Sequence, residues 1–347
     1  MSNLYNKYSK EDLKSQRDAE GMSRRTLSFY RYVRLENLEE LRANLYRNWE
    51  TLAVLGRVYI ASEGINAQIS VPESNWEQFV SDLQGIKEFS DMPLKIALEE
   101  KGDSFLKLIV RIKEQIVADG LEENEIDMTK IGKHLEPDEF DKALENPNAV
   151  VVDMRNHYES EVGRFEGAIC PDVDTFKESL PIIKEMLKQQ KDQPVLLYCT
   201  GGIRCEKASA YMIANGFSDV SQLQGGIINY AHEIEKGASK SKYLGKNFVF
   251  DDRLGERITD DVISNCHICG SSCDDHTNCK NDDCHLLFIQ CQTCDEKLSG
   301  CCCSACQDIA ALPLDEQRIL RKERERHEGR PEHKSRLRPK PKLNGTD

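Results

Sequence analysis

The sequence predicts an α/β protein in three parts: a ferredoxin-like α/β sandwich over residues 25–120, a parallel-sheet α/β domain over 125–240, and a Cys-rich segment over 262–312. Three observations lead to this prediction. The first part has the order strand, helix, hairpin, helix, strand, and the second alternates strands with helices. Eleven of the fourteen cysteines then fall between Cys266 and Cys306. A chain of 347 residues is long enough for two or three domains.

The helices and strands of the N-terminal part are predicted from the spacing of its apolar residues. Leucines and a tryptophan recur at helical spacing over 35–49, and a second amphipathic helix is expected over 73–83. Strands are expected over 26–33, 57–70 and 105–112, the middle one a hairpin that turns at Ser62-Glu63-Gly64. This order of elements is typical of ferredoxin-like folds, and such a fold names no function by itself.

The central part alternates apolar strands with amphipathic helices, which indicates a parallel sheet with both faces covered. Strands are expected over 149–154, 195–198 and 220–223, and helices over 137–144, 175–190, 206–215 and 226–236. Ligands of such sheets bind beyond the carboxyl ends of the strands. Cys199 directly follows one of these strands, so we expect the functional site there.

The loop after that strand is suited to hold a thiolate. Two glycines let backbone N–H groups turn inward, the following helix presents its positive end, and Arg204 adds a fixed charge. All three favour the anionic form of Cys199, which predicts a nucleophile near neutral pH. The alternative, a small buried cysteine before a turn, leaves the glycines and the arginine unexplained. The predicted cradle comprises Thr200, Gly201, Gly202 and Ile203 between Cys199 and Arg204.

The spacing of the loop separates two chemistries. Four residues between cysteine and arginine make a cradle one residue tighter than the one that fits phosphate, which favours a single extra sulfur. Four short motifs precede or follow the Cys199 loop in the sequence: VVDMR over 151–155, GRFEGA over 163–168, GF at 216–217 and GG at 225–226. In this order they resemble the rhodanese-like domain over about residues 125–236. The resemblance implies that Cys199 accepts a sulfur as a persulfide.

Three further residues near this loop are auxiliary candidates. Asp153 and Arg155 form the usual strand-end pair of the rhodanese fold, and a structural ion pair is the favoured interpretation. Cys205 either resolves an oxidised Cys199 into a disulfide or is a core thiol at the helix start, and both interpretations stand.

The whole arrangement resembles a larger family. RVYIASEGIN over 57–66, YCTGGIRCEKAS over 198–209 and the Cys-rich segment are similar to the TrhO family of oxygen-dependent tRNA uridine hydroxylases, over about residues 25–310. The resemblance implies oxidation of the wobble uridine, the first anticodon base, to 5-hydroxyuridine. It implies the tRNA anticodon region as partner, molecular oxygen as co-substrate, Cys199 as the reactive thiol and a sulfur or electron donor protein. We expect the N-terminal half to wall one side of the site.

Two other functions stay open on the residues alone. One is a rhodanese-type sulfurtransferase that passes persulfide sulfur from Cys199 to a thiol, cyanide or a tRNA base. The other is a non-enzymatic redox or RNA-binding regulator with a Cys199–Cys205 switch. The sequence shows no glycine fingerprint of a nucleotide cofactor. His134-Leu-Glu136 and His157-Tyr-Glu159 are the only pairs that could begin a non-haem iron site, and such pairs are common by chance.

The Cys-rich segment predicts metal binding. Four pairs supply enough thiolates for two tetrahedral sites, which favours structural zinc over free thiols, with an iron–sulfur cluster as the minor alternative. Cys273, Cys301 and Cys302 are left over, with His267, His276 and His285 as substitutes. The predicted ligands are Cys266 with Cys269, Cys279 with Cys284, Cys291 with Cys294, and Cys303 with Cys306.

The distribution of charge limits the kinds of partner that the protein is expected to bind. A net charge of −13 argues against sequence-independent coating of nucleic acid, but residues 313–347 form a basic, largely disordered tail that could touch RNA.

Residues 1–24 are a polar, mobile leader without a secretory signal, and no apolar run is long enough to cross a membrane, so we expect a cytoplasmic protein. The aromatic residues considered for stacking on RNA, each more readily explained as packing, are Tyr230, Tyr243, Phe248 and Phe288.

Overall fold

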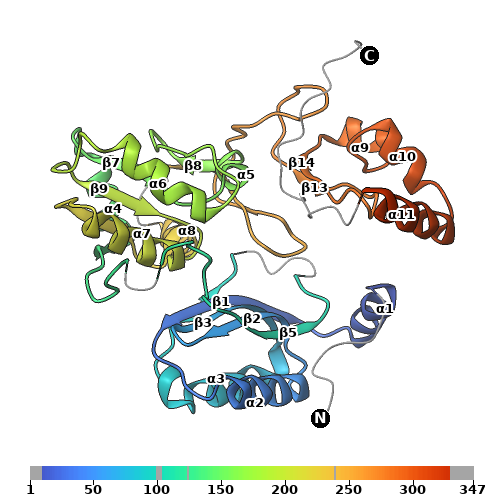
Figure 1. Ribbon diagram of the computed structural model, residues 1–347, viewed down its shortest axis with the longest axis horizontal. Coiled ribbons are helices and arrows are strands. Elements are labelled where there is room, and N and C mark those ends of the chain that lie inside the picture. Colours follow the sequence, from blue (N-terminus) through green and yellow to red (C-terminus); the bar gives the residue numbers. More distant parts are fainter. Residues whose placement is uncertain (1–9, 99–103, 123–124, 238–239, 329–347) are drawn as a thin grey trace.

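The computed structural model describes residues 10–98, 104–122, 125–237 and 240–328, and the statements below concern these residues. Figure 1 shows three parts: the N-terminal sheet with its helices at the bottom, the central domain above it on the left, and the Cys-rich part on the right. Residues 1–9 of the predicted leader and 329–347 of the predicted tail lie outside this description. Within the leader, Lys10–Glu20 form helix α1.

The N-terminal part is a five-stranded sheet in the order β4-β1-β3-β2-β5. Neighbouring strands are antiparallel except β5, which runs parallel to β2. The strands are β1 (Arg24–Tyr32), β2 (Leu55–Ala61), β3 (Gly64–Pro72), β4 (Lys95–Ile96) and β5 (Leu108–Ile112). The order β4-β1-β3-β2 is the predicted ferredoxin-like arrangement, but its fourth strand is the short β4. The strand expected over 105–112 is instead β5, which pairs with β2 at the opposite edge of the sheet. The sequence did not reveal β4, because its two residues are too few to show an alternating pattern.

The two faces of this sheet differ. Helices α2 (Leu38–Thr51) and α3 (Trp76–Gln84), with the short turns η1 (Glu73–Asn75) and η2 (Lys87–Phe89), cover one face. Phe29, Trp49 and Phe79 pack there with ring centroids 5.4 to 6.4 Å apart. Side chains alternate along a strand, so the intervening residues of β2, Arg57 and Tyr59, point to the opposite, open face.

The central domain is a four-stranded parallel sheet in the order β6-β10-β9-β7 with helices on both faces. The strands are β6 (Lys133–Leu135), β7 (Val150–Asp153), β9 (Val195–Tyr198) and β10 (Val220–Leu223). Helices α6 (Phe176–Met186) and α7 (Ile203–Ala214) pack against Val195 and Leu197, whereas α4 (Pro137–Leu144) and α8 (Gly226–Glu235) pack against Leu196 and Tyr198. The strand β9 that leads to Cys199 is therefore buried on both faces, as predicted.

A small sheet that the sequence did not indicate joins the central domain to the Cys-rich part. Its strands are β8 (Gly163–Phe165), β11 (Tyr243–Asn247) and β12 (Glu256–Arg257), in the order β12-β11-β8. The stretch 237–261 is polar, and its Lys, Asp and Gly residues mask the alternation of β11. Tyr243 of β11 is fully buried against Phe165, at 5.3 Å between ring centroids.

The suggested RNA-stacking role of four aromatic residues is wrong. Each is at most 2% exposed and packs in a hydrophobic cluster, so no base can reach its ring. These residues are Tyr230, Tyr243, Phe248 and Phe288.

The Cys-rich part contains β13 (His276–Asn278), β14 (Leu287–Ile289), α9 (Gln292–Leu298) and α10 (Ser304–Ala310). A further helix, α11 (Leu314–Glu328), occupies the first part of the predicted basic tail. No helix in the described part of the chain is long and apolar enough to span a membrane.

Candidate functional site

Cys199 lies at the end of β9, where the backbone turns into α7. Gly202 caps that helix with φ +97°, a left-handed conformation that L side chains rarely adopt. A Cβ at this position would also lie 2.7 Å from the Tyr30 hydroxyl oxygen. The turn places the Gly202 N–H as a donor 3.1 Å from the Cys199 sulfur. Glycine is therefore required both by the backbone angle and by the approach of the N-terminal domain.

The surroundings of Cys199 favour the thiolate. Burial by itself raises the pKa of this thiol, but hydrogen bonds from the Cys205 thiol, the positive charge of Arg204 and the backbone N–H groups of both residues outweigh it. The pKa falls to about 5, so the sulfur is anionic at neutral pH. Burial and the contact with Cys199 raise the pKa of Cys205 well above its usual value, which keeps it a proton donor.

Arg204 is fixed by a carboxylate that the sequence did not pair with it. Its guanidinium donates two hydrogen bonds to Glu159 of α5 (His157–Ser160), 2.6 and 2.8 Å long, and one to the Thr200 hydroxyl, 3.2 Å long. The charge of Arg204 lowers the pKa of Glu159 despite complete burial of the carboxyl. The pair therefore holds the arginine's charge beside the thiolate.

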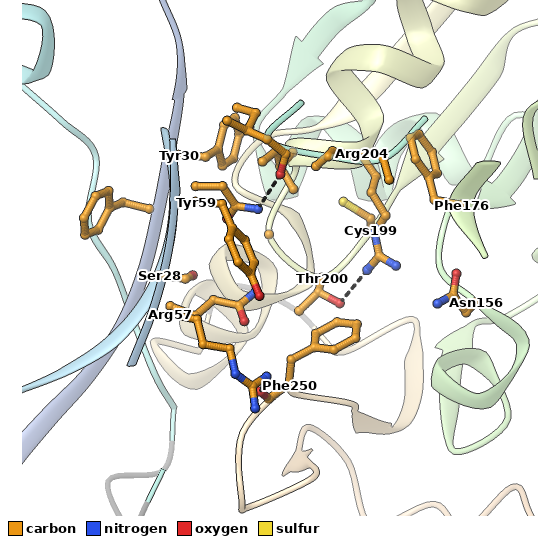
Figure 2. Close-up of a pocket in the computed structure, with 18 of the residues that line it drawn as sticks. Ser28, Tyr30, Arg57, Tyr59, Asn156, Phe176, Cys199, Thr200, Arg204 and Phe250 are labelled. Atoms are coloured by element: carbon orange, nitrogen blue, oxygen red, sulfur yellow. Dashed lines mark hydrogen bonds between the residues drawn. The ribbon is translucent and has the colours of Figure 1, made fainter. Parts of the chain in front are cut away.

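A cavity of about 710 Å³ opens beside Cys199, between the loop and the open face of the N-terminal sheet. Figure 2 shows Cys199, Thr200 and Arg204 on one side and Tyr30, Tyr59 and Arg57 on the other. The expectation that the N-terminal half walls one side of the site is therefore confirmed. The lining residues also include Ser28, Asn66, Gln68, Ile116, Asn156, Phe176, Gly201, Ile203, Ile228 and Phe250.

Polar contacts hold the two halves of the cavity together. The Tyr30 hydroxyl donates to Glu206 of α7 (2.9 Å) and the Tyr32 hydroxyl to the Ile203 carbonyl (3.3 Å). Lys207 is buried and pairs with Glu63 at 2.6 Å and with Asp119 at 2.7 Å. Glu63 belongs to the tight connection between β2 and β3. The two long sequence motifs therefore meet at the site.

Asp153 and Arg155 lie away from the cavity. Both are at most 1% exposed and form a two-point ion pair, with nitrogen–oxygen distances of 2.9 and 2.7 Å. Arg155 also donates to the Gly163 carbonyl, 2.6 Å away, and so ties the end of β7 to β8. This geometry favours the structural interpretation of the pair.

Neither His-x-Glu pair forms a site for iron. His134 hydrogen-bonds Glu206, 2.9 Å away, while Glu136 caps helix α4. His157 contacts the Val173 carbonyl at 3.0 Å, and Glu159 is held by Arg204. Within each pair the two side chains have separate partners.

The structure gathers eight cysteines of the C-terminal part into two groups of four. Within each group the sulfur atoms lie within 4.8 Å of one another, which suits a tetrahedral metal ion bound by thiolates. One group is Cys266, Cys269, Cys291 and Cys294, and the other is Cys279, Cys284, Cys302 and Cys306.

Cys303 was predicted as a ligand, and this is wrong: Cys302 takes its place. The Cys302 sulfur lies 3.8 Å from the Cys284 sulfur and 3.7 Å from the Cys306 sulfur. The Cys303 sulfur stays outside the group, 4.0 Å from the Cys302 sulfur. The Cys302 N–H donates to the Cys279 sulfur at 3.5 Å, which fixes that choice.

Sequence reasoning missed the residues that the N-terminal domain contributes to the cavity. Arg57, Tyr59 and Asn66 lie in the motif over 57–66, and the alternation of a strand places Arg57 and Tyr59 on one face. That alternation could have identified these two. Tyr30 and Phe250 come from distant segments and carry no local signal.

Matches to known proteins extend over most of the chain. Three family models match: the UPF0176 acylphosphatase like domain over residues 24–116, the Rhodanese-like domain over 136–233 and the Rhodanase C-terminal model over 244–307. The tRNA uridine(34) hydroxylase of Leptospira interrogans is 53% identical, over 97% of this chain and 92% of its own length. Those of Photorhabdus laumondii and Yersinia pestis are each 49% identical over 94% of this chain, and over 93% and 92% of their own lengths. The chain therefore belongs to the tRNA uridine(34) hydroxylase family.

Proposed function

We propose that this protein hydroxylates the wobble uridine of tRNA, giving 5-hydroxyuridine with molecular oxygen as co-substrate, and that Cys199 is the reactive group. One observation carries the proposal: a thiolate faces a cavity built by both halves of a chain that is 53% identical to a tRNA uridine(34) hydroxylase. A cytoplasmic location belongs to the same proposal.

The cavity has the size and lining for one flipped-out nucleotide. Its 710 Å³ falls within the roughly 300–1,000 Å³ of small-molecule sites. Aromatic rings of Tyr30 and Phe250 offer faces for a base. The amides of Asn66 and Gln68 carry both donors and acceptors, as the edge of uracil requires.

The thiolate gives this site a route to the C5 position. Attack of the Cys199 sulfur on C6 of uracil forms an S–C6 bond and places an electron pair at C5. C5 then bonds to one oxygen atom of O2 to give a hydroperoxide, and two thiols of the donor protein cleave its O–O bond, which leaves the C5 hydroxyl and water. Loss of the C5 proton and cleavage of the S–C6 bond then release the thiolate. Overall, uridine, O2 and two thiols give 5-hydroxyuridine, water and a disulfide, with a thiol donor protein as the reductant.

A second candidate function is sulfur transfer. The tight cradle around Cys199 and the match to the Rhodanese-like domain favour it, because a persulfide on Cys199 would be stabilised by the same donors. Here the sulfur would pass to a thiol, cyanide or a tRNA base.

Mass spectrometry of tRNA nucleosides separates the two functions. A strain that lacks the gene should lose 5-hydroxyuridine and its derivatives and regain them on complementation. Loss of thiolated bases with normal 5-hydroxyuridine would instead support sulfur transfer and contradict the hydroxylase.

We also propose that each group of four cysteines binds a structural zinc ion. Four thiolates fill the tetrahedral shell and leave no open position for chemistry, so the ions would stabilise the fold. Metal analysis of anaerobically purified protein should find two zinc ions per chain. Iron together with acid-labile sulfide would contradict zinc.

A further inference from the structure

The open face of the N-terminal sheet continues beyond the cavity, from β2 onto β5. Arg57 and Tyr59 line the cavity from β2. Tyr59 pairs with Arg111 across the parallel strands, so both side chains point to this face. Lys113 comes two residues after Arg111, just past the end of β5, and its ammonium group lies 5.7 Å from the centre of the Tyr59 ring. These four residues, named the β2–β5 platform, form one strip that begins inside the cavity.

Among the described residues, the cations of the platform have no acidic partners. Within the part of the chain that the structure describes, no carboxylate oxygen lies within 4.0 Å of a side-chain nitrogen of Arg57, Arg111 or Lys113. All three residues are exposed, whereas the buried Arg204 and Lys207 are paired. In a chain of net charge −13, three neighbouring cations that no described carboxylate neutralises favour a polyanionic ligand.

We propose that the β2–β5 platform binds the RNA strand that flanks the reacting uridine. Phosphates of the strand pair with Arg57, Arg111 and Lys113, and a neighbouring base stacks on Tyr59. Proteins bind single-stranded RNA by this combination of cations along the backbone and aromatic rings under the bases. The proposal rests on the proposed function, because it takes the uridine in the cavity as the point from which the strand leaves.

Charge neutralisation tests the phosphate contacts. The probe is a synthetic anticodon stem-loop with uridine at position 34, and the protein is the full chain carrying Cys199→Ser, which prevents turnover. Arg111→Gln with Lys113→Gln should weaken binding about tenfold near 0.15 M salt. Each lost phosphate contact should reduce the slope of log K against log salt by roughly 0.7.

Arg47→Gln with Lys87→Gln is the matched control, because these exposed residues lie on α2 and η2 on the covered side of the sheet. It changes net charge by the same amount and should leave affinity and salt slope unchanged. Equal loss in both double variants would overturn the proposal, since it would indicate net charge alone.

Substitution of Tyr59 tests the stacking contact. Tyr59→Ala should weaken binding about tenfold because the stacked base loses its aromatic partner, while Tyr59→Phe keeps the ring and should retain affinity. If the Arg111/Lys113 variant binds the stem-loop as tightly as its parent while wild-type protein forms 5-hydroxyuridine, the platform proposal fails and the function stands. An unmodified uridine 34 with wild-type protein would contradict the function itself.

Discussion

The Cys199 loop and the two cysteine groups of the C-terminal part both gather sulfur, but they surround it differently. In the loop, one sulfur receives hydrogen bonds from backbone N–H groups and from Cys205, next to the paired Arg204. In each group, four sulfurs face one another within 4.8 Å. Four thiolates at that separation repel strongly unless a cation lies between them. The same residue type is therefore prepared for reaction in one place and for metal binding in the other.

The difference shows that the surroundings of a cysteine indicate its role better than the number of cysteines does. The loop thiolate is stabilised by donors of the protein itself and opens into a cavity, so it can attack a ligand and leave again. A sulfur that binds a metal ion in a complete coordination shell stabilises the fold and is not free to react. Substitutions should therefore separate activity from stability.

The largest expected effect is on activity at Cys199. Cys199→Ser keeps the shape of the side chain but removes the thiolate, so 5-hydroxyuridine formation should fall at least about 10³-fold. The temperature of unfolding should hardly change. Cys170→Ser is the matched control, because Cys170 is a half-buried thiol of the same domain outside the cavity. Full activity of Cys199→Ser, measured on nucleosides, would refute its proposed role.

The next largest effect is on metal content and stability in the second cysteine group. Cys302→Ser should lose one of the two bound ions and destabilise the C-terminal part, whereas Cys303→Ser should keep both. Metal analysis with thermal unfolding measures the two outcomes. The reverse result would restore Cys303 as the ligand and contradict the structure at this point.

The sequence was most informative where the signal is local. A buried strand, two glycines and an arginine predicted the Cys199 turn, and paired cysteines predicted metal groups. The sequence could not decide between Cys302 and Cys303, since both precede Cys306 at spacings compatible with shared ligation and only the positions of the sulfur atoms in space distinguish them. The contacts of Glu159 and Tyr30 with the loop helix were missed because each residue comes from a segment more than 40 residues away.

A smaller effect is expected from the ion pair beside the loop. Arg204→Gln leaves the buried Glu159 carboxylate without its partner, which should lower the free energy of unfolding by about 3–5 kcal/mol. It also removes a charge that lowers the pKa of Cys199, so that pKa should rise. Arg204→Lys keeps the charge but loses the two-point contact. It should therefore destabilise the fold while leaving the Cys199 pKa low, as measured by denaturation and thiol titration.

Alkylation of the native, metal-loaded protein as a function of pH tests the central comparison most directly. The rate at Cys199, followed by peptide mass spectrometry, should have its midpoint near pH 5 and fall as the pH drops through that value, because only the thiolate reacts. Cys170, whose pKa burial raises to about 11, serves as the internal reference. The eight grouped cysteines should stay protected until a chelator is added. A Cys199 midpoint near 9, the ordinary value, or grouped cysteines that react as fast as Cys199 without chelator, would contradict the account.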